Sequence, residues 1–519
     1  MGTGRRRHWG LVGLIGLAFA LRLFRLDFQS LWRDEVDAVR FACAPLADLL
    51  GAFVRPGQNG PLYHLLLRPW LHLAGDGEFG LRFFSLIWGV LAVPLTFRLA
   101  RRIFPSLPGV ACLAALLATT SPYLVWYSQE GKMYTLVVAL ILLSMDRYLA
   151  ALERGGTWRW LVYVICTGLA PYVHFVAALI IPAQVFIFLA QDRLCRRHRW
   201  RPWLASLAVL TLPYLPLLAW QLPLLLHPGD TGFRFVPLPD MFSSALSSYS
   251  LGVVQPAPWW TLALFAGLWL AAGLLWRDRL VRPASLAVLL CWLLVPMLGL
   301  FLISLSRPLY TARYLIFVLP ACLLLLAGGL AALGRRSRVV AGLWAVALLA
   351  LNGRGLWLQA TTPLKADFRA ATRYVLSHLA ADEVVLFQIP YGRYSFDYYA
   401  RHLPPKAPGA GQPFSKHPAG SYRAFLPQVV RPGNELYRWA EGPYTNAGMS
   451  AAELDRRMAG IAAGSRAVWL VATEVALWDE RGLVQAWLEQ HGRLADQARF
   501  VQVSVYRYEF PMTNDQCRR

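Results

Sequence analysis

Two adjacent carboxylates directly after the first apolar run offer the clearest chemistry in the sequence. Asp34 and Glu35 follow Trp32, and only 14 of the 29 acidic residues occur before residue 358. A carboxylate at a membrane surface can accept a proton from a reacting hydroxyl or hold a cation. The same pattern is typical of a solvated loop with an interfacial tryptophan, so the pair alone leaves both interpretations open.

A short apolar helix is predicted after Gly60-Pro61, because a Gly-Pro break before an apolar run is typical of a helix start. The run meets Arg68-Pro69 before it could cross a bilayer, so we expect it to lie flat at the interface. His64 lies in its first turn, where a histidine is more often structural than catalytic.

Charged side chains also occur at the ends of two later apolar runs. Glu130 and Lys132 lie between two predicted helices, with Tyr134 close behind, and Arg313-Tyr314 precedes another helix. An arginine fork suits a phosphate. Each charge could instead mark a helix boundary or an interfacial anchor, but their predicted position on the same membrane face as Asp34 favours a function.

The elements that must position these residues are membrane helices. Hydrophobic residues make up 57% of the 519 residues and charged residues 15%, below the roughly 25% typical of soluble domains. We predict about eleven spans, near 9–26, 82–104, 109–127, 132–151, 159–174, 175–190, 202–224, 258–276, 283–305, 312–333 and 338–357.

The stretch 159–190 could be one long helix kinked at Pro171. The first run could be a signal peptide, but its apolar pattern continues through Leu26 and favours a retained helix.

The charge distribution predicts the orientation. The chain carries 51 Lys plus Arg against 29 Asp plus Glu, a formal charge of +22. Most of the excess is arginine in six short stretches between apolar runs, which is typical of cytoplasmic loops and not of a nucleic-acid-binding face. These stretches are 5–7, 101–102, 147–159, 193–201, 277–282 and 335–338. We therefore expect the N-terminus inside, and the Asp34 loop and everything after Trp357 outside.

The composition changes after Trp357. A helix is predicted from Thr361-Thr362-Pro363, strands at 383–387 and 467–471, a helix after the capping box at Ser450, another at 483–488, and a half-buried strand at 500–507. The expected organisation is a polytopic α-helical membrane domain at 1–357 and a small extracytoplasmic α/β domain at 358–519.

The four sites together resemble a known family. Trp32-x-Asp34-Glu35, Gly60-Pro61-Leu62-Tyr63, the run from Ser128 to Tyr134, and Arg313-Tyr314 with Pro320 resemble the bacterial branch of the GT-C glycosyltransferases. This branch is related to the dolichyl-phosphate-mannose protein mannosyltransferases and the lipid A aminoarabinose transferases. The resemblance covers about residues 9–330. Lys132, where arginine is more usual, and Gln58-Asn59, where His-Pro-Pro is common, depart from the family pattern.

The resemblance implies a multi-pass enzyme of the cytoplasmic (inner) membrane with its active site outside. It would transfer a sugar from a polyprenyl-phosphate donor to a glycan, lipid or protein acceptor. Asp34 and Glu35 would be catalytic, with Asp34 as the base. The substrate-binding residues would be Glu130, Lys132, Tyr134, Arg313, Tyr314 and His64. A divalent cation is left open, and no nucleic-acid partner is expected.

A membrane transporter or lipid flippase is the alternative, because transporters also use charges within the membrane. Such a protein should have an internal repeat and broken helices near the bilayer midplane. We find no clear repeat in the sequence, and the charges gather at the outer ends of the predicted spans.

Overall fold

The computed structural model describes the chain except for residues 1, 55–58, 108, most of 213–232, most of 255–280, 381, 390–391, 403–421, 425–448, 464 and 512–519. The described residues form two compact units. The membrane unit consists of residues 1–26 and 45–362, and the α/β unit consists of residues 27–44 and 363–519. The segment that carries Asp34 and Glu35 thus groups with the C-terminal part of the chain.

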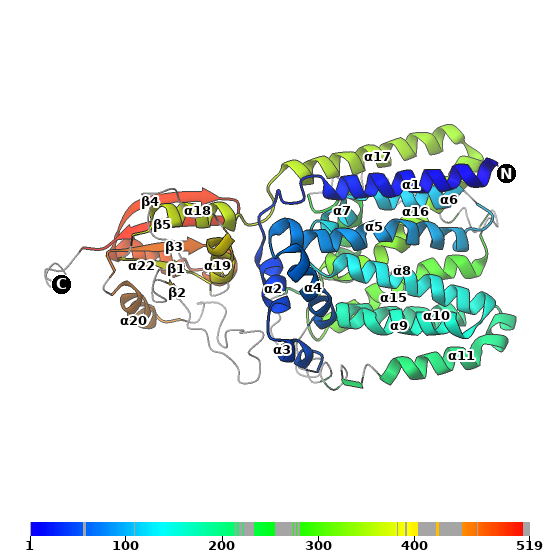
Figure 1. Ribbon diagram of the computed structural model, residues 1–519, viewed down its shortest axis with the longest axis horizontal. Coiled ribbons are helices and arrows are strands. Elements are labelled where there is room, and N and C mark those ends of the chain that lie inside the picture. Colours follow the sequence, from blue (N-terminus) through cyan, green and yellow to red (C-terminus); the bar gives the residue numbers. More distant parts are fainter. Residues whose placement is uncertain are drawn as a thin grey trace. The chain divides into compact units, whose positions relative to one another are not determined.

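The membrane unit is built from helices (Figure 1). They are α1 (Gly2–Leu23), α3 (Leu46–Gly51), α4 (Pro61–Ala74), α5 (Glu78–Ile103), α6 (Gly109–Thr120), α7 (Pro122–Ser128), α8 (Tyr134–Arg154), α9 (Thr157–Val173), η1 (Phe175–Leu179), α10 (Ile180–Leu189), α11 (Arg193–Thr211), α13 (Leu238–Leu251), α15 (Pro283–Ser304), η3 (Ala312–Val318), α16 (Leu319–Arg336) and α17 (Arg338–Thr361).

Five of these segments are long and apolar enough to cross a membrane, within the described part of the chain: α5, α8, α15, α17 and η3 with α16. A sixth forms if α6 and α7, bent by 55°, count as one span. The chain is therefore a multi-pass helical membrane protein. The predicted span at 258–276 lies almost wholly outside the described residues, and the count of eleven stays a prediction.

The helices of the membrane unit differ in how much of their surface the rest of the protein covers. In the apolar 18-residue stretch of each span, the buried share is 94% for η3 with α16 and 83% for α8, but only 17% for α17. Val339, Leu343 and Val346 of α17 are largely exposed. Apolar side chains exposed along a whole helix suit contact with lipid tails. We conclude that α8 and α16 form the centre and that α17 lies at the edge.

The bend between α6 and α7 is held by buried polar contacts. Ser121 caps α7 by accepting a hydrogen bond from the Leu124 N–H at 3.3 Å, and Pro122 occupies the first turn, where no N–H is needed. Arg22 of α1 is fully buried and donates to Ser128 Oγ at 3.1 Å. It also donates to two carbonyls at the end of α6. The end of α7 and the loop that follows it are thereby fixed.

The stretch 159–190 forms two separate helical segments. Helix α9 ends at Val173, His174 has an extended backbone (φ −153°, ψ 116°), and η1 and α10 follow. The break therefore lies three residues beyond Pro171, at a histidine.

The α/β unit contains one five-stranded sheet in the order β2-β1-β3-β5-β4. Strand β1 (Glu383–Phe387) pairs parallel with β2 (Tyr422–Ala424) and β3 (Ala467–Ala472), while β5 (Val503–Glu509) pairs antiparallel with β3 and β4 (Arg493–Phe500). The helices of the unit are α2 (Arg33–Ala42), α18 (Phe368–His378), α19 (Gly392–His402), α20 (Ala451–Ala462), α21 (Val475–Trp478) and α22 (Leu483–His491).

Two local predictions in this unit are wrong. The helix predicted from Thr361 begins at Phe368, because Asp367 caps it by accepting a hydrogen bond from the Ala370 N–H at 3.0 Å. The single strand predicted at 500–507 is a hairpin of β4 and β5, turned at Gln502 with a φ of 55°. The alternation of side chains continues through this turn, so the sequence pattern alone does not reveal it. The capping box at Ser450 is confirmed, since its hydroxyl accepts from the Glu453 N–H at 3.2 Å.

Candidate active site

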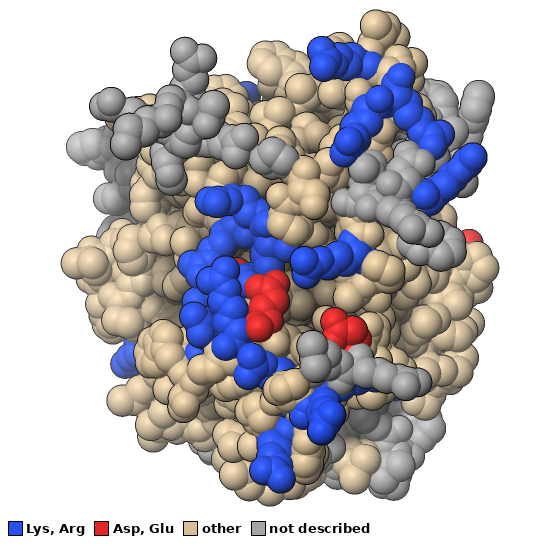
Figure 2. Space-filling view, turned by 90° about the vertical axis from the view of Figure 1, so that its right-hand side faces the viewer, with Lys and Arg blue, Asp and Glu red and all other residues tan. Residues whose placement is uncertain are grey.

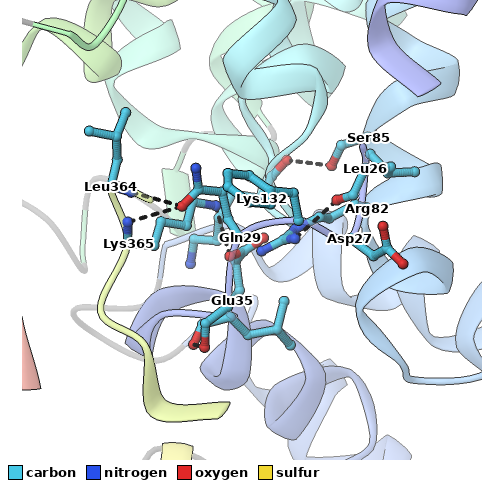
Figure 3. Close-up of polar contacts among 12 residues, drawn as sticks. Leu26, Asp27, Gln29, Glu35, Arg82, Ser85, Lys132, Leu364 and Lys365 are labelled. Carbon is cyan, nitrogen blue, oxygen red and sulfur yellow. Dashed lines mark hydrogen bonds and ion pairs between the residues drawn. The ribbon is translucent and has the colours of Figure 1, made fainter. Parts of the chain in front are cut away.

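The loop between α7 and α8 carries Glu130 and Lys132, and α5 holds this loop tightly. A Cβ on Gly131 would lie 2.4 Å from Leu81 Cγ, so only glycine permits this approach. Ser85 of α5 donates its hydroxyl to the Lys132 carbonyl at 3.1 Å (Figure 3). Thr135 in turn donates to the Ser85 carbonyl at 2.8 Å. The backbone at Lys132 is therefore fixed where α8 begins, and its side chain is only partly buried.

The charges of Lys132 and Arg313 both reach His174, although the three residues lie far apart in the sequence. Both cations act electrostatically on the His174 ring. The ring centroid of His174 lies 4.9 Å from that of Tyr314 and 6.0 Å from that of Tyr134. The Arg313 guanidinium carbon lies 5.8 Å from the Tyr314 ring centroid. The structure thus brings Tyr134 of α8 and Arg313 and Tyr314 of η3 around His174, with the charge of Lys132, from the loop before α8, also acting on this ring.

A row of tyrosines extends this cluster. The ring centroids of Tyr249, Tyr123, Tyr127 and Tyr134 follow one another at 5.2, 4.7 and 4.8 Å. The Tyr249 hydroxyl donates to the carbonyls of Ala312 and Leu315, which holds η3 against α13. Phenols are apolar on their faces and polar at their tips. Such a row suits a ligand that is both charged and lipidic.

The Asn59-Gly60-Pro61 motif packs beside the same cluster. Gly60 has a φ of +81°, and a Cβ there would lie 3.1 Å from Met133 Cε and from the Val173 carbonyl oxygen. The Asn59 side-chain oxygen accepts a hydrogen bond from the Phe175 N–H at 3.2 Å. The motif therefore fastens the start of α4 to the break at His174. Gln58 lies outside the described residues.

His64 lies on α4 and is 1% exposed. Burial, together with the charge of Lys132, lowers its pKa to about 3. The ring is therefore neutral near pH 7 and cannot serve as a cation for phosphate. The charge of Lys132 reaches His64, but the His64 side chain is packed in the interior of the membrane unit.

The carboxylates of α2 lie in the α/β unit and have different surroundings. Glu35 is fully buried and forms an ion pair with Lys365 Nζ at 2.8 Å, drawn in Figure 3. The Asp34 side chain is 19% exposed, with Arg33 Nε at 3.5 Å. Asp34 can therefore meet a solvent-borne group, whereas Glu35 is held in the interior of the unit.

The segment before α2 is also fixed within its unit. The Gln29 side-chain oxygen accepts hydrogen bonds from the backbone N–H groups of Leu364 and Lys365 (Figure 3). The Tyr399 hydroxyl accepts a hydrogen bond from the Leu31 N–H at 2.6 Å. The start of α2 is thus set by residues more than 300 positions away.

Comparisons with known proteins show which folds the chain resembles. A family model described as dolichyl-phosphate-mannose-protein mannosyltransferase matches residues 56–220. The crystal structure of apo ArnT from Cupriavidus metallidurans matches with a TM-score of 0.59 and 14% identity, over 97% of this chain and 98% of that chain. The same protein bound to undecaprenyl phosphate matches with a TM-score of 0.55 and 14% identity, over 98% of both chains.

A more distant match is the apo oligosaccharyltransferase of Archaeoglobus fulgidus, with a TM-score of 0.52 and 13% identity, over 92% of this chain and 71% of that chain. No curated protein sequence matches the chain. The chain has the GT-C fold. The resemblance predicted from the four motifs is confirmed, and the transporter alternative gains no support from these matches.

One residue of this cluster escaped the sequence analysis. His174 is 1% exposed, and neither ring nitrogen has a hydrogen-bond partner within the described part of the chain. The available signal was a histidine in an apolar run, three residues after a proline. A membrane-embedded ionisable residue is a functional candidate by default.

Neither unit offers a cluster of three or more His, Cys, Asp or Glu side chains suited to a metal ion, among the residues that the structure describes. Of the carboxylates in the predicted sites, Asp34 has a side chain that is 19% exposed, whereas Glu35 and Glu130 are buried. A role for a divalent cation stays open.

Proposed function

We propose that this chain is an integral-membrane glycosyltransferase that moves a sugar from a polyprenyl-phosphate donor to an acceptor hydroxyl. The transfer takes place on the outer face of the cytoplasmic membrane. The observation that carries the proposal is that the charges of Lys132 and Arg313 both reach His174, beside a row of tyrosines, in a membrane unit with the GT-C fold. Support for the donor class comes from ArnT, whose matching structure is bound to undecaprenyl phosphate.

The proposed reaction is a single displacement. The acceptor oxygen forms a bond to the anomeric carbon while the bond from that carbon to the lipid phosphate oxygen breaks. Lys132 and Arg313 stabilise the charge on the departing phosphate. Asp34 takes the acceptor proton. Glu130 and Tyr134 orient the sugar, and the apolar helices hold the lipid chain.

The unequal burial of the two α2 carboxylates supports different roles for them. A base must reach the acceptor proton, which suits the partly exposed Asp34. Glu35 is neutralised by Lys365 and supports the helix that presents Asp34. The acceptor class is left open between glycan, lipid and protein.

We expect the purified chain to consume a polyprenyl-phosphate sugar when an acceptor extract from the native envelope is present. The Arg313→Gln variant should transfer about tenfold to a hundredfold more slowly, because it loses a charge-assisted contact to the phosphate. The Arg307→Gln variant, changed in the same way six residues earlier, is the matched control and should remain near the normal rate. Sugar release is measured by mass spectrometry of the lipid. Transfer from a nucleotide sugar without any lipid donor would refute the proposed donor class.

We also expect the α/β unit and the loop at Gly155-Gly156 to lie on opposite sides of the membrane. A reporter enzyme that is active only outside the cytoplasm should be active when fused after Arg519. The same reporter inserted between Gly155 and Gly156 should be inactive, since arginine-rich loops are retained inside. The reverse pattern would invert the proposed active face.

A further inference from the structure

A second pocket lies at the opposite end of α8 from Lys132. Helix α8 has 21 residues and is roughly 30 Å long, about the thickness of the hydrocarbon core of a bilayer. The pocket encloses about 430 Å³ where α5 and α8 end, α10 joins α11 and α15 begins. Figure 2 views this face of the membrane unit, where basic side chains (blue) surround a few acidic groups (red).

The acidic groups at this pocket are already engaged. Asp146 is fully buried, with Arg98 Nε at 2.9 Å and Arg102 Nε at 3.1 Å. Glu153 also pairs with Arg102. Asp192 caps α11 by accepting a hydrogen bond from the Cys195 N–H at 2.7 Å. These carboxylates are therefore already paired with arginines or a backbone N–H of the membrane unit.

Two arginines that line the pocket have no such partner among the described residues. Arg199 lines the pocket and donates its Nε–H to the Leu152 carbonyl at 3.2 Å, a neutral acceptor, while its terminal nitrogens lie against Gly155. Arg282 is exposed at the start of α15. Neither forms an ion pair with a carboxylate in the described part of the chain.

The backbone adds to this positive potential. Helix α15 begins at the pocket without a side-chain cap, so its dipole favours an anion there, whereas the start of α11 is already capped by Asp192. The Ser285 side chain, in the first turn of α15, also lines the pocket. Apolar residues form another part of the lining, the apolar wall, which includes Ile103, Leu149 and Val288.

We propose that this pocket binds the phosphate head group of an anionic phospholipid from the adjoining leaflet. The arginines and the start of α15 fit the phosphate, and the apolar wall fits the first segments of the acyl chains. The site is independent of the proposed donor site, which lies at the other end of α8. Inorganic phosphate shares the chemistry of the head group but cannot use the apolar wall.

The test uses the full chain in detergent, with native mass spectrometry to count retained lipids. With equal amounts of phosphatidylglycerol and phosphatidylcholine, we expect one phosphatidylglycerol to be retained in preference. The Arg199→Gln/Arg282→Gln double variant should bind this lipid at least about tenfold more weakly. The matched control is Arg335→Gln/Arg338→Gln, which removes two exposed arginines elsewhere at the arginine-rich end and should bind normally.

Arg199 also contacts the end of α8, so the double variant could fold poorly. Arg282→Gln alone changes an exposed side chain and should still weaken retention by several-fold. Equal retention by the wild type and the Arg282→Gln variant would overturn the proposal, as would no preference over phosphatidylcholine. Displacement of the lipid by millimolar inorganic phosphate would assign the pocket to free phosphate instead.

Discussion

The Asp34→Asn variant should insert and fold normally yet transfer sugar at least about 10²-fold more slowly than the wild type. The change is nearly isosteric and removes only a charge and a proton acceptor from a partly exposed side chain. General-base assistance contributes on the order of 10²–10⁴ in rate. Donor affinity should fall much less, because the base acts in the transition state. Transfer rate and donor binding are to be measured separately on the purified variant.

The matched control for this variant is Asp37→Asn. Asp37 lies three residues later on the same helix and pairs with Arg40 at 2.8 Å, so the change alters the charge of α2 equally. We expect it to keep most of the activity. If Asp34→Asn transferred sugar at the rate of Asp37→Asn, Asp34 could not be the base, and Glu130 would become the leading candidate.

The Glu35→Gln variant is expected to have a lower free energy of unfolding, whereas its folded form should keep most of its transfer activity. Removing one partner of a buried ion pair leaves the other charge uncompensated, at a cost of about 3–5 kcal/mol. For a unit of this size the loss corresponds to a Tm lower by at least about 6 °C. The Glu35→Leu/Lys365→Met double variant should recover most of this loss, since it removes both buried charges. Thermal unfolding of the purified full chain measures both.

The exposed pair Glu453–Arg457 in the same unit is the comparison for Glu35. Glu453→Gln removes the same charge from a carboxylate that is 40% exposed, so its cost should stay below about 1 kcal/mol. Similar melting of Glu35→Gln and Glu453→Gln, combined with a large loss of transfer by Glu35→Gln alone, would return Glu35 to a catalytic role.

The sequence predicted the helices well where length and hydropathy decide the structure. The runs near 82–104, 132–151, 283–305 and 338–357 match α5, α8, α15 and α17 within a few residues at most ends. Lys132 and Arg313 were found because charges interrupt apolar runs, where they are costly and therefore informative.

The features that the sequence analysis missed depend on distant contacts. The extended backbone at His174 is stabilised by the Asn59 hydrogen bond to Phe175, across 116 positions. The burial of Glu35 depends on Lys365, and no local pattern distinguishes it from Asp34. Hydrophobic periodicity reports which face of an element is buried, but it does not report which partner covers that face.

The grouping of residues 27–44 with the C-terminal part imposes an order on biosynthesis. Glu35 leaves the ribosome 330 positions before Lys365, a delay of roughly 20–60 s at typical rates of synthesis. During that time α2 must remain unpaired with its final neighbours while the membrane helices insert one after another. Helix α2, which carries the proposed base Asp34, thus reaches its final packing only after the membrane helices have been synthesised. A chain that stalls or is cleaved after α17 would contain all the described helices of the membrane unit and still lack the support for the helix that carries the proposed base.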